Sequence, residues 1–425
     1  MIDSTNKRKN IFALLLVCIP ILNQYMFFPL TFWEILCIGI VLYSLLTKKI
    51  THLRYPDRFY GIFCAYLVFS VFFSNIYSND ISITSFVFRF IKIALVSFAV
   101  LFLFCEFLKY VEDFKYWMHK IMWLISWILI FQLLMYYLFG RMIYPIIPNM
   151  TLNYNDGINS SVLINNSIQE VLRGYYFRPS SVFLEPAHYA TFSVIGIIFE
   201  LFDDDFGKQK VVSAIFFSIC TVLTTSSLSL VLCAMAWVCF LMYRKDLWKS
   251  NSLRMLLLII FVIPIAIYFL AQQEGVLTSI VIKLTSLSDL SVGSSTSVRL
   301  LRGLQYFKQM GFVTKIFGVG YGGLSEYYYS HGINIIGDVG EQVSYMNGIS
   351  TILCSVGVVG VSVFVLFVIS SYKKINRLGK SLLVCFMLAL FTSDMFNSPV
   401  YYLIIILVFM LKRESYNNQF AVTKQ

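Results

Sequence analysis

Residues 348–374 read GISTILCSVGVVGVSVFVLFVISSYKK. From Gly348 to Tyr372 this stretch has no charged side chain, and two lysines then close it. An α-helix needs about 20 mostly apolar residues to cross the roughly 30 Å hydrocarbon core of a bilayer. The stretch therefore predicts a transmembrane helix over 348–370, with its Lys-rich end on one side of the membrane.

The same criterion finds further apolar segments along the whole chain. The twelve candidate spans lie near 11–28, 30–47, 59–77, 84–108, 121–139, 186–202, 211–225, 228–243, 255–271, 348–370, 381–396 and 399–411. The last two are short and are joined by Asn397-Ser-Pro399, so a broken hairpin that only dips into the membrane is an alternative for them. With 58% hydrophobic residues, 13% charged residues and a mean hydropathy of +0.76, the chain is too apolar for a soluble domain. We predict an all-α polytopic membrane protein.

Basic residues assign the sides of the membrane. If the amino terminus is cytoplasmic, 23 of the 33 Lys and Arg residues fall in segments on that side, and every such segment holds some. This is the positive-inside pattern, and it accounts for the net charge of +11 without a nucleic-acid partner. Both termini are then cytoplasmic. No A-x-A-like cleavage site follows Lys7-Arg-Lys9, so we expect the first helix to be retained.

The spans divide the chain into five parts. These are 1–139 with five spans, 140–185 as a first large outer loop, 186–271 with four spans, 272–347 as a second large outer loop, and 348–425 with three spans and a cytoplasmic tail. Ten basic residues lie outside the cytoplasmic segments, and eight of them are in the two long loops. Topology does not explain these eight, so we expect the functional surface on the outer, periplasmic face.

Several kinds of site are not expected. All nine cysteines lie inside apolar runs, where Cys behaves as a small hydrophobe, so we predict neither a disulfide framework nor a metal site. The chain has no G-x-x-x-x-G-K-[ST] motif, and no cytoplasmic segment is long enough for a nucleotide-binding domain. ATP-driven transport by this chain alone is therefore not expected.

The first loop enters the sixth span through Arg178-Pro-Ser-Ser-Val-Phe-Leu-Glu-Pro-Ala-His-Tyr-Ala190. Pro186 suits the first turn of a helix, which puts Glu185 at the helix mouth and His188 on roughly the same face. A carboxylate and an imidazole at the membrane surface can act as a general base for a hydroxyl nucleophile. The alternative is that Glu185 only caps the helix and His188 lies in the interface.

In the second loop, Gly293-Ser-Ser-Thr-Ser297 leads into a predicted amphipathic helix. At about 100° per residue, Arg299, Arg302 and Tyr306 share one face, and the opposite face holds Leu300, Leu304 and Phe307. Such a helix can lie on the membrane and present two guanidinium groups to a phosphate or pyrophosphate. A solvated face or a general contact with anionic lipid explains the spacing equally well.

Three further features belong to the outer face. Arg89, Lys92 and Asp394 are ionisable residues predicted near the outer ends of spans, where they can extend an anion-binding site, although snorkelling is the simpler explanation for the two cations. Gly318-Val-Gly-Tyr-Gly-Gly323 predicts a flexible turn and not a dinucleotide site. The aromatic run 327–329 is typical of an interfacial belt.

In its span layout and in residues 178–190, the chain resembles the Wzy-type O-antigen and capsular polysaccharide polymerases, bacterial membrane glycosyltransferases related to the O-antigen ligases. Looser similarity comes from Arg299-x-x-Arg302, the glycine turn, and Asn347 leading into Gly357-Val-Val-Gly360. The ligases tend to have a histidine shortly before that asparagine. Here Ser344, Tyr345 and Met346 precede it, which favours polymerase over ligase.

The resemblance implies a membrane glycosyltransferase fold of the GT-C type that uses neither nucleotide sugar nor metal. Its substrates would be undecaprenyl-pyrophosphate-linked glycans at the periplasmic face of the inner membrane, with a chain-length regulator and a flippase as possible partners. The residues implied to bind pyrophosphate or glycan are Arg173, Arg178, Arg299 and Arg302. Tyr306, on the same helix face as the last two, and Arg89 and Lys92 are further predicted substrate contacts. Glu185, and after it His188, is implied as the base.

Other readings of the sequence stay open. A lipid-linked oligosaccharide flippase, or another secondary transporter, would also have about twelve spans, but its site should lie near the bilayer midplane, often at broken helices. An O-antigen ligase is the alternative within the enzyme class. A non-catalytic scaffold gives no reason for Arg299 and Arg302 to share a helix face.

Overall fold

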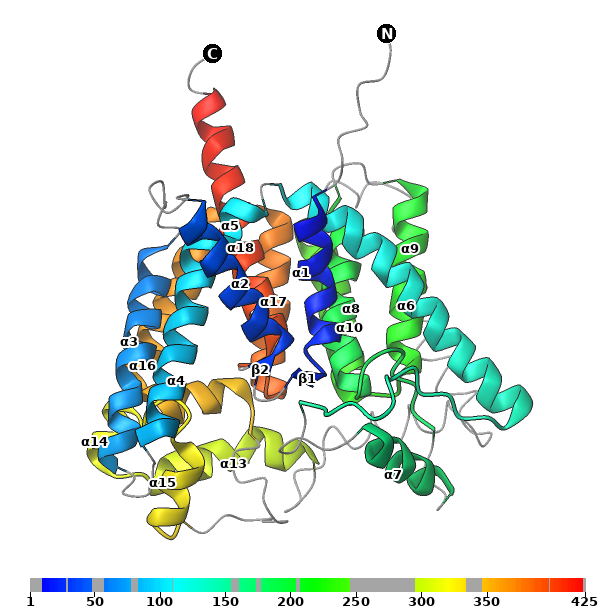
Figure 1. The fold of residues 1–425 in the computed structure, drawn as a ribbon. Coiled ribbons are helices and arrows are strands. Elements are labelled where there is room, and N and C mark those ends of the chain that lie inside the picture. The colour runs from blue at the N-terminus through cyan, green and yellow to red at the C-terminus, as the bar shows by residue number, and fades with distance from the viewer. Residues whose placement is uncertain are drawn as a thin grey trace.

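The computed structural model describes residues 10–27, 30–47, 57–77, 83–108, 110–153, 160–172, 177–203, 207–244, 295–333, 346–396 and 398–422. Apart from one small β-hairpin, the regular structure in these residues is helical, which confirms the predicted all-α class. Figure 1 shows a bundle in which α1 begins and α18 ends at the same end. The predicted span over 255–271 lies outside the described residues.

Helices occupy all the other predicted spans. In chain order they are α1 (Ile11–Leu22), α2 (Phe32–Leu46), α3 (Arg58–Tyr77), α4 (Ile83–Phe98) continued by the π-helix η2 (Ala99–Leu103) and α5 (Phe104–Phe107), α6 (Val111–Phe139), α8 (Pro186–Leu201), α9 (Lys208–Leu223), α10 (Ser227–Tyr243), α16 (Gly348–Lys374), α17 (Arg377–Thr392) and α18 (Pro399–Val422). Within the described residues, four are long and apolar enough to cross a membrane, namely α3, α4 with η2, α6 and α16. α1, α2, α8 and α10 are apolar but shorter. These helices indicate a membrane protein.

The last helix forms the centre of the bundle. Residues 400–411 of α18 are all buried, and the helix packs on α1, α5, α6, α16 and α17. A helix that is apolar on every side is stable only when neighbours or lipid surround it. α17 and α18 are separate helices of 16 and 24 residues, so the last two predicted spans are both helical.

Ion pairs hold the helix ends where the termini lie. The Lys412 ammonium of α18 pairs with the carboxylate of Asp57, which also accepts hydrogen bonds from the backbone N–H groups that begin α3. Arg413 pairs with Glu106 of α5 at 3.3 Å. The positive residues that predicted the cytoplasmic side therefore also connect α18 to two neighbouring helices.

The two long loops both lie at the opposite end of the bundle, which we call the loop face (Figure 1). The first contains α7 (Ser160–Leu172), and the second contains α13 (Ser295–Gln309), α14 (Phe312–Phe317) and α15 (Leu324–Ser330). The hairpin of β1 (Met26–Phe27) and β2 (Leu30–Thr31) joins α1 to α2 at this face. The first span, predicted to reach residue 28, therefore ends at Leu22.

Candidate functional site

Helix α16 is broken at Gly357, whose backbone has φ 65° and ψ −172°. In a regular α-helix the carbonyls of Cys354 and Ser355 would accept hydrogen bonds from the residues four positions further along. Here they accept from the backbone N–H groups of Val319 and Gly320, at 3.0 and 2.9 Å. The part of α16 before the break packs on the second loop, and the part after it runs beside α3 (Figure 1).

The glycine segment 318–323 is the piece of the second loop that enters this break. A Cβ on Gly320, where φ is +99°, would lie 2.4 Å from the carbonyl oxygen of Ser70 and 2.5 Å from the amide nitrogen of Ser74, both in α3. The next residue, Tyr321, donates its backbone N–H to the Ser70 hydroxyl at 3.1 Å. The segment is thus locked between α3 and α16, and the prediction of a flexible turn is wrong. The glycines are needed because backbones meet there.

Two ion pairs flank the glycine segment. Arg89 of α4 pairs with Glu326 of α15, and the Arg89 side chain also lies against Gly322. Nη1 of Arg89 is buried and has no hydrogen-bond partner in the part of the chain that the structure describes. Lys92, one turn further along α4, pairs with Glu34 of α2. The two cations therefore meet specific carboxylates at the loop face, and snorkelling alone does not explain them.

Glu34 has two roles at the start of α2. One carboxylate oxygen accepts the backbone N–H of Thr31 at 2.9 Å, and the Thr31 hydroxyl accepts the backbone N–H of Glu34 at 3.4 Å, which together form a capping box. The other oxygen pairs with Lys92. Capping holds this carboxylate in place, so the position of the Lys92 ammonium is also restricted.

Tyr321 and Asp394 lie between these ion pairs. Burial raises the pKa of Tyr321 to about 12, and the negative charges of Glu34 and Asp394 add to the rise, whereas Arg89 opposes it. α17 ends at Thr392, so Asp394 lies in the connection to α18, just beyond the helix end near which it was predicted. Its side chain is open to solvent, yet protein atoms surround it on most sides. These are the properties of a residue in the wall of a recess.

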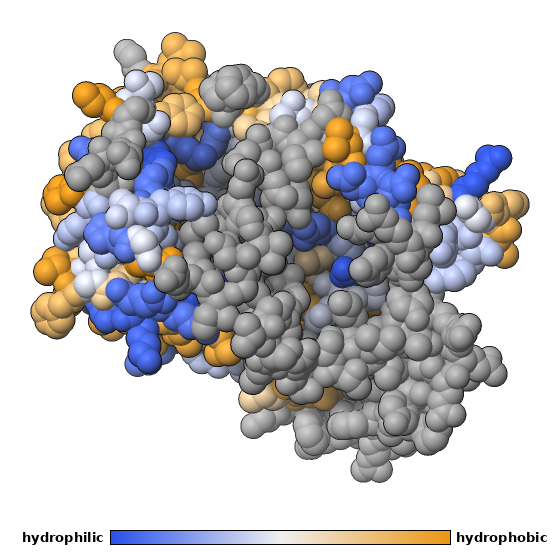
Figure 2. All heavy atoms as spheres, turned by 90° about the horizontal axis from the view of Figure 1, so that it is seen from below, coloured by the Kyte–Doolittle hydropathy of each residue, from blue (hydrophilic) through white to orange (hydrophobic). Residues whose placement is uncertain are grey.

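We call this recess, formed by Glu34, Arg89, Lys92, Tyr321, Glu326 and Asp394, the charged recess. Figure 2 looks onto the loop face and shows a hollow near its centre with hydrophilic side chains visible inside it. Sequence reasoning pointed to Arg89, Lys92 and Asp394 but missed both glutamates and Tyr321. Glu34 had a local signal, because Thr31-x-x-Glu34 before an apolar run is the capping-box pattern.

Helix α13 lies against the amino end of α16 with its arginine face turned inward. Arg302 is 6% exposed and Tyr306 is 1% exposed, whereas Leu304 on the opposite face is 54% exposed. Gly303 lies so close to Ser350 that a Cβ there would be 2.1 Å from the Ser350 Cβ. The two predicted faces are therefore real. However, the arginine face is not solvated, as one alternative had it, but packs on α16.

This packing changes the interpretation of Tyr306. Its ring stacks on that of Tyr328, with 3.9 Å between the centroids and 7° between the planes, inside a small core with Met310 and Val319. Tyr306 therefore packs in the protein and presents no ring to a substrate, contrary to its assignment from helical spacing. Of the aromatic run 327–329, Tyr327 and Tyr328 are also buried and only Tyr329 is exposed, so the prediction of a belt of three interfacial tyrosines is wrong.

Two of the predicted arginines cannot be placed in the site. Arg299 belongs to α13, but its side chain lies outside the described part of the chain, and so does the whole of Arg173.

The mouth of α8 forms a second part of the loop face. Glu185 is the N-cap residue of α8, and its backbone carbonyl accepts from the N–H of His188 at 3.1 Å. Glu185 thus occupies the predicted capping position, but its carboxylate makes no capping hydrogen bond. Glu185 is half-buried, and His188 and Arg178 are exposed.

Two buried glutamines hold the turn-containing segment that leads to this mouth. Gln132 of α6 accepts the backbone N–H of Ser181 at 2.8 Å, and Gln24, just after α1, donates to the carbonyl of Val182 at 3.2 Å and accepts the N–H of Leu184. Because these amides fix the backbone on both sides, the position of Glu185 is determined by α1 and α6 as well as by α8.

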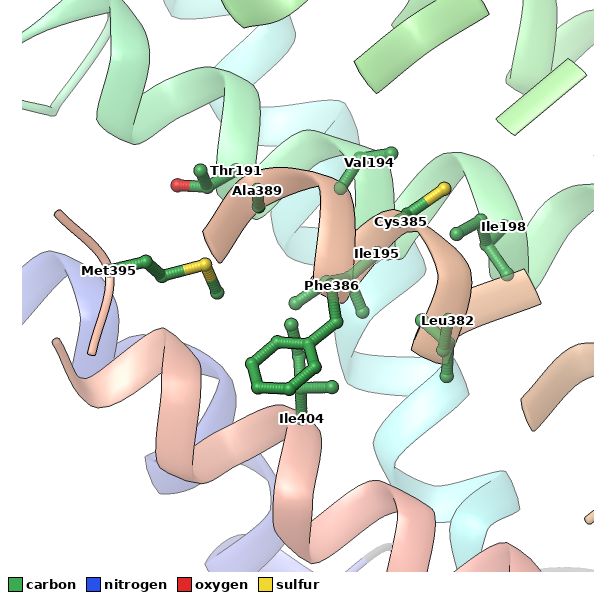
Figure 3. Close-up of a pocket in the computed structure, with 10 residues that line it drawn as sticks. All are labelled: Thr191, Val194, Ile195, Ile198, Leu382, Cys385, Phe386, Ala389, Met395 and Ile404. Carbon is green, nitrogen blue, oxygen red and sulfur yellow. The ribbon is translucent and has the colours of Figure 1, made fainter. Parts of the chain in front are cut away.

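A small pocket lies between α8, α17 and α18. Thr191, one turn into α8, faces it together with Met395, the residue after Asp394 (Figure 3). Phe386 of α17 and Ile404 of α18 are also in the lining, which is apolar except for Thr191. The pocket is therefore a gap in helix packing and not a polar binding site, but it places the start of α8 beside the connection between α17 and α18.

Comparison with known proteins adds no assignment. No protein-family model matches this chain, and no curated protein matches it either. What the loop face can do therefore follows from its own residues. It presents Arg89 and Lys92 in ion pairs, the buried Arg302 of α13, which packs against the start of α16, and the solvent-accessible Asp394. Together these side chains suit an anionic ligand and the transfer of a proton.

Proposed function

We propose that this chain is a glycosyltransferase that polymerises lipid-linked oligosaccharide repeat units, as in O-antigen or capsule synthesis. The observation that carries this proposal is the charged recess at the loop face, beside the buried Arg302 and the broken helix α16. A polymerase of this kind needs cations for a lipid pyrophosphate and a carboxylate for an acceptor hydroxyl, at the face where the repeat unit arrives. The recess supplies both.

In the proposed reaction, the hydroxyl at the non-reducing end of a new lipid-linked repeat unit attacks the anomeric carbon of the growing glycan. The bond between that carbon and the undecaprenyl pyrophosphate breaks, and negative charge develops on the leaving group. Guanidinium groups that are already in position stabilise such charge without reorganisation. Arg302 and Arg178 are the described candidates, and we keep Arg299 and Arg173 from the sequence.

The finer points of fold and location belong to the same proposal. Twelve spans, a GT-C-type arrangement, and a site on the periplasmic side of the bacterial inner membrane all fit a loop face opposite the basic ends of α17 and α18. The partners would be undecaprenyl-pyrophosphate-linked glycans and membrane lipids, with a flippase upstream and a chain-length regulator beside it.

The broken helix α16 favours one other class, because transporters often build their sites at discontinuous helices. Here, however, the break is filled by a loop segment, and the residues before it pack on α13 and α14 at the loop face. Such an arrangement supports a site near the membrane surface, whereas alternating access needs one near the midplane. We therefore rank flippase second.

The test is a gel profile of surface glycan from cells that lack this gene, complemented with wild type, Arg302→Ala or Arg178→Ala at matched protein levels. We expect a single repeat unit on lipid A core in the deletion strain and no ladder with either variant. Arg413→Ala is the control, since it removes an exposed arginine at the opposite end. Bare core with polymer left on the carrier lipid would instead identify a ligase, and repeat units held in the cytoplasmic leaflet would identify a flippase.

A further inference from the structure

The three carboxylates of the charged recess are not equivalent. Glu34 is held by Lys92 and by the Thr31 backbone, and Glu326 is held by Arg89. Asp394 has no salt-bridge partner among the residues that the structure describes, and its side chain is open to solvent. It is therefore the carboxylate of this recess that can accept a proton from a bound molecule without first breaking an ion pair.

The backbone around Asp394 is fixed against the first turn of α16. The carbonyl of Ser393 accepts the N–H of Gly348 at 2.9 Å, and the Asn347 side chain caps the same turn by accepting the N–H of Ser350 at 2.8 Å. The hydroxyl of Thr351 in this turn lies near the Asp394 carboxylate. A base on such a supported connection keeps its position relative to a ligand.

Arg302 approaches the same turn from α13. The following residue, Gly303, lies on Ser350, and Ser350 precedes Thr351. The first turn of α16 is thus contacted by Gly303, the residue after the buried Arg302, and by Asp394 through Thr351. This is the arrangement that a glycosyl diphosphate needs, with a cation for its phosphates and a carboxylate near the attacking hydroxyl.

We propose that Asp394 is the general base that deprotonates the acceptor hydroxyl, in place of Glu185. The inference rests on the proposed function and assigns a step within it. As the acceptor oxygen forms its bond to the anomeric carbon, the hydroxyl proton moves to an Asp394 oxygen. The bond from the anomeric carbon to the diphosphate oxygen breaks, and its electron pair leaves with the lipid diphosphate. Asp394 then releases the proton to water.

The titration of Asp394 suits this role. Burial raises its pKa from 3.8 to about 7, and the hydroxyl of Thr351 opposes the rise. A base works best when its pKa lies near the working pH, because it is then both available and strong enough. The other titratable groups around the recess are Glu34, Arg89, Lys92, Arg302, Tyr321 and Glu326.

The experiment uses full-length protein purified into vesicles, with undecaprenyl-pyrophosphate-linked repeat unit extracted from the deletion strain as substrate. Four variants are compared with wild type: Asp394→Asn, Asp394→Glu, Glu185→Gln and, as control, Glu112→Gln, which changes an exposed carboxylate at the opposite end. The readouts are the initial rate of polymer formation, its pH dependence, and substrate binding measured by protection from proteolysis.

We expect Asp394→Asn to lose about 10²–10⁴-fold in rate while it still binds the substrate, because it removes proton transfer alone. Asp394→Glu should recover part of the rate. The wild-type rate should rise as pH increases through about 7, since only the ionised carboxylate accepts a proton. Glu185→Gln and Glu112→Gln should keep this pH profile.

Two results would overturn the assignment. One is an Asp394→Asn variant that polymerises within a few-fold of wild type, and the other is a loss of rate matched by an equal loss of binding. If Glu185→Gln alone abolished the pH-dependent limb, the base would be Glu185. If wild type itself formed no polymer at any pH, the proposed function would fail, and the role of Asp394 would fail with it.

Discussion

Gly320 is the position where the fold of the loop face is most sensitive to a single methyl group. Its φ of +99° is unfavourable for any residue with a Cβ, and an alanine Cβ would lie 2.4 Å from a backbone carbonyl of α3. The backbone conformation costs roughly 1–2 kcal/mol. Forcing a methyl group into filled space adds about 1–3 kcal/mol. Gly320→Ala should therefore destabilise the protein by about 2–5 kcal/mol.

Gly332→Ala is the matched control. Gly332 also has a positive φ of +58°, but no atom lies within 4 Å of a Cβ placed there. Gly332→Ala should therefore lower the free energy of unfolding only by the cost of the backbone conformation, about 1–2 kcal/mol. Thermal unfolding of both purified variants in the same detergent, followed by tryptophan fluorescence, measures the difference. Equal midpoints for the two variants would refute the insertion of the glycine segment between α3 and α16.

Two further predictions concern stability. Tyr306→Ala should destabilise the protein by about 3–5 kcal/mol, because it empties a stacked, 1% exposed site. The same change at Tyr329, which is 67% exposed, should have little effect in the same unfolding assay; comparable losses would argue against the stack. Lys412→Ala should cost about 3–5 kcal/mol, because it leaves the Asp57 carboxylate, 1% exposed, without its ion-pair partner. Arg413→Ala breaks an exposed pair and should cost about 0–1 kcal/mol, so a similar shift for both would contradict the buried pair.

Much of the architecture followed from local pattern. Apolar runs of sufficient length predicted the helices, since hydrocarbon leaves backbone groups no partner except one another. Basic residues between the runs correctly put the two long loops at one end and the ends of α1 and α18 at the other. The helical period correctly separated the arginine face of α13 from its apolar face. Each of these depends only on neighbours along the chain.

The composition of the loop face was decided by the tertiary structure. Helical spacing shows that Arg302 and Tyr306 share a face, but it does not say whether that face meets solvent or protein, and here it meets α16. The glycine-rich run 318–323 also does not reveal its partner. Because α16 is broken at Gly357, two of its backbone carbonyls are left to accept hydrogen bonds from this run.

The sequence by itself determined that this is a helical bundle with two long loops on one side, because burial of apolar segments is a property of each segment alone. Only the tertiary structure decided which charges meet. Arg89 and Glu326 are 237 residues apart along the chain, and no local rule pairs them. Their contact, and the position of Asp394 near it without a salt-bridge partner among the described residues, arise because α4, α15 and the connection between α17 and α18 converge on one recess.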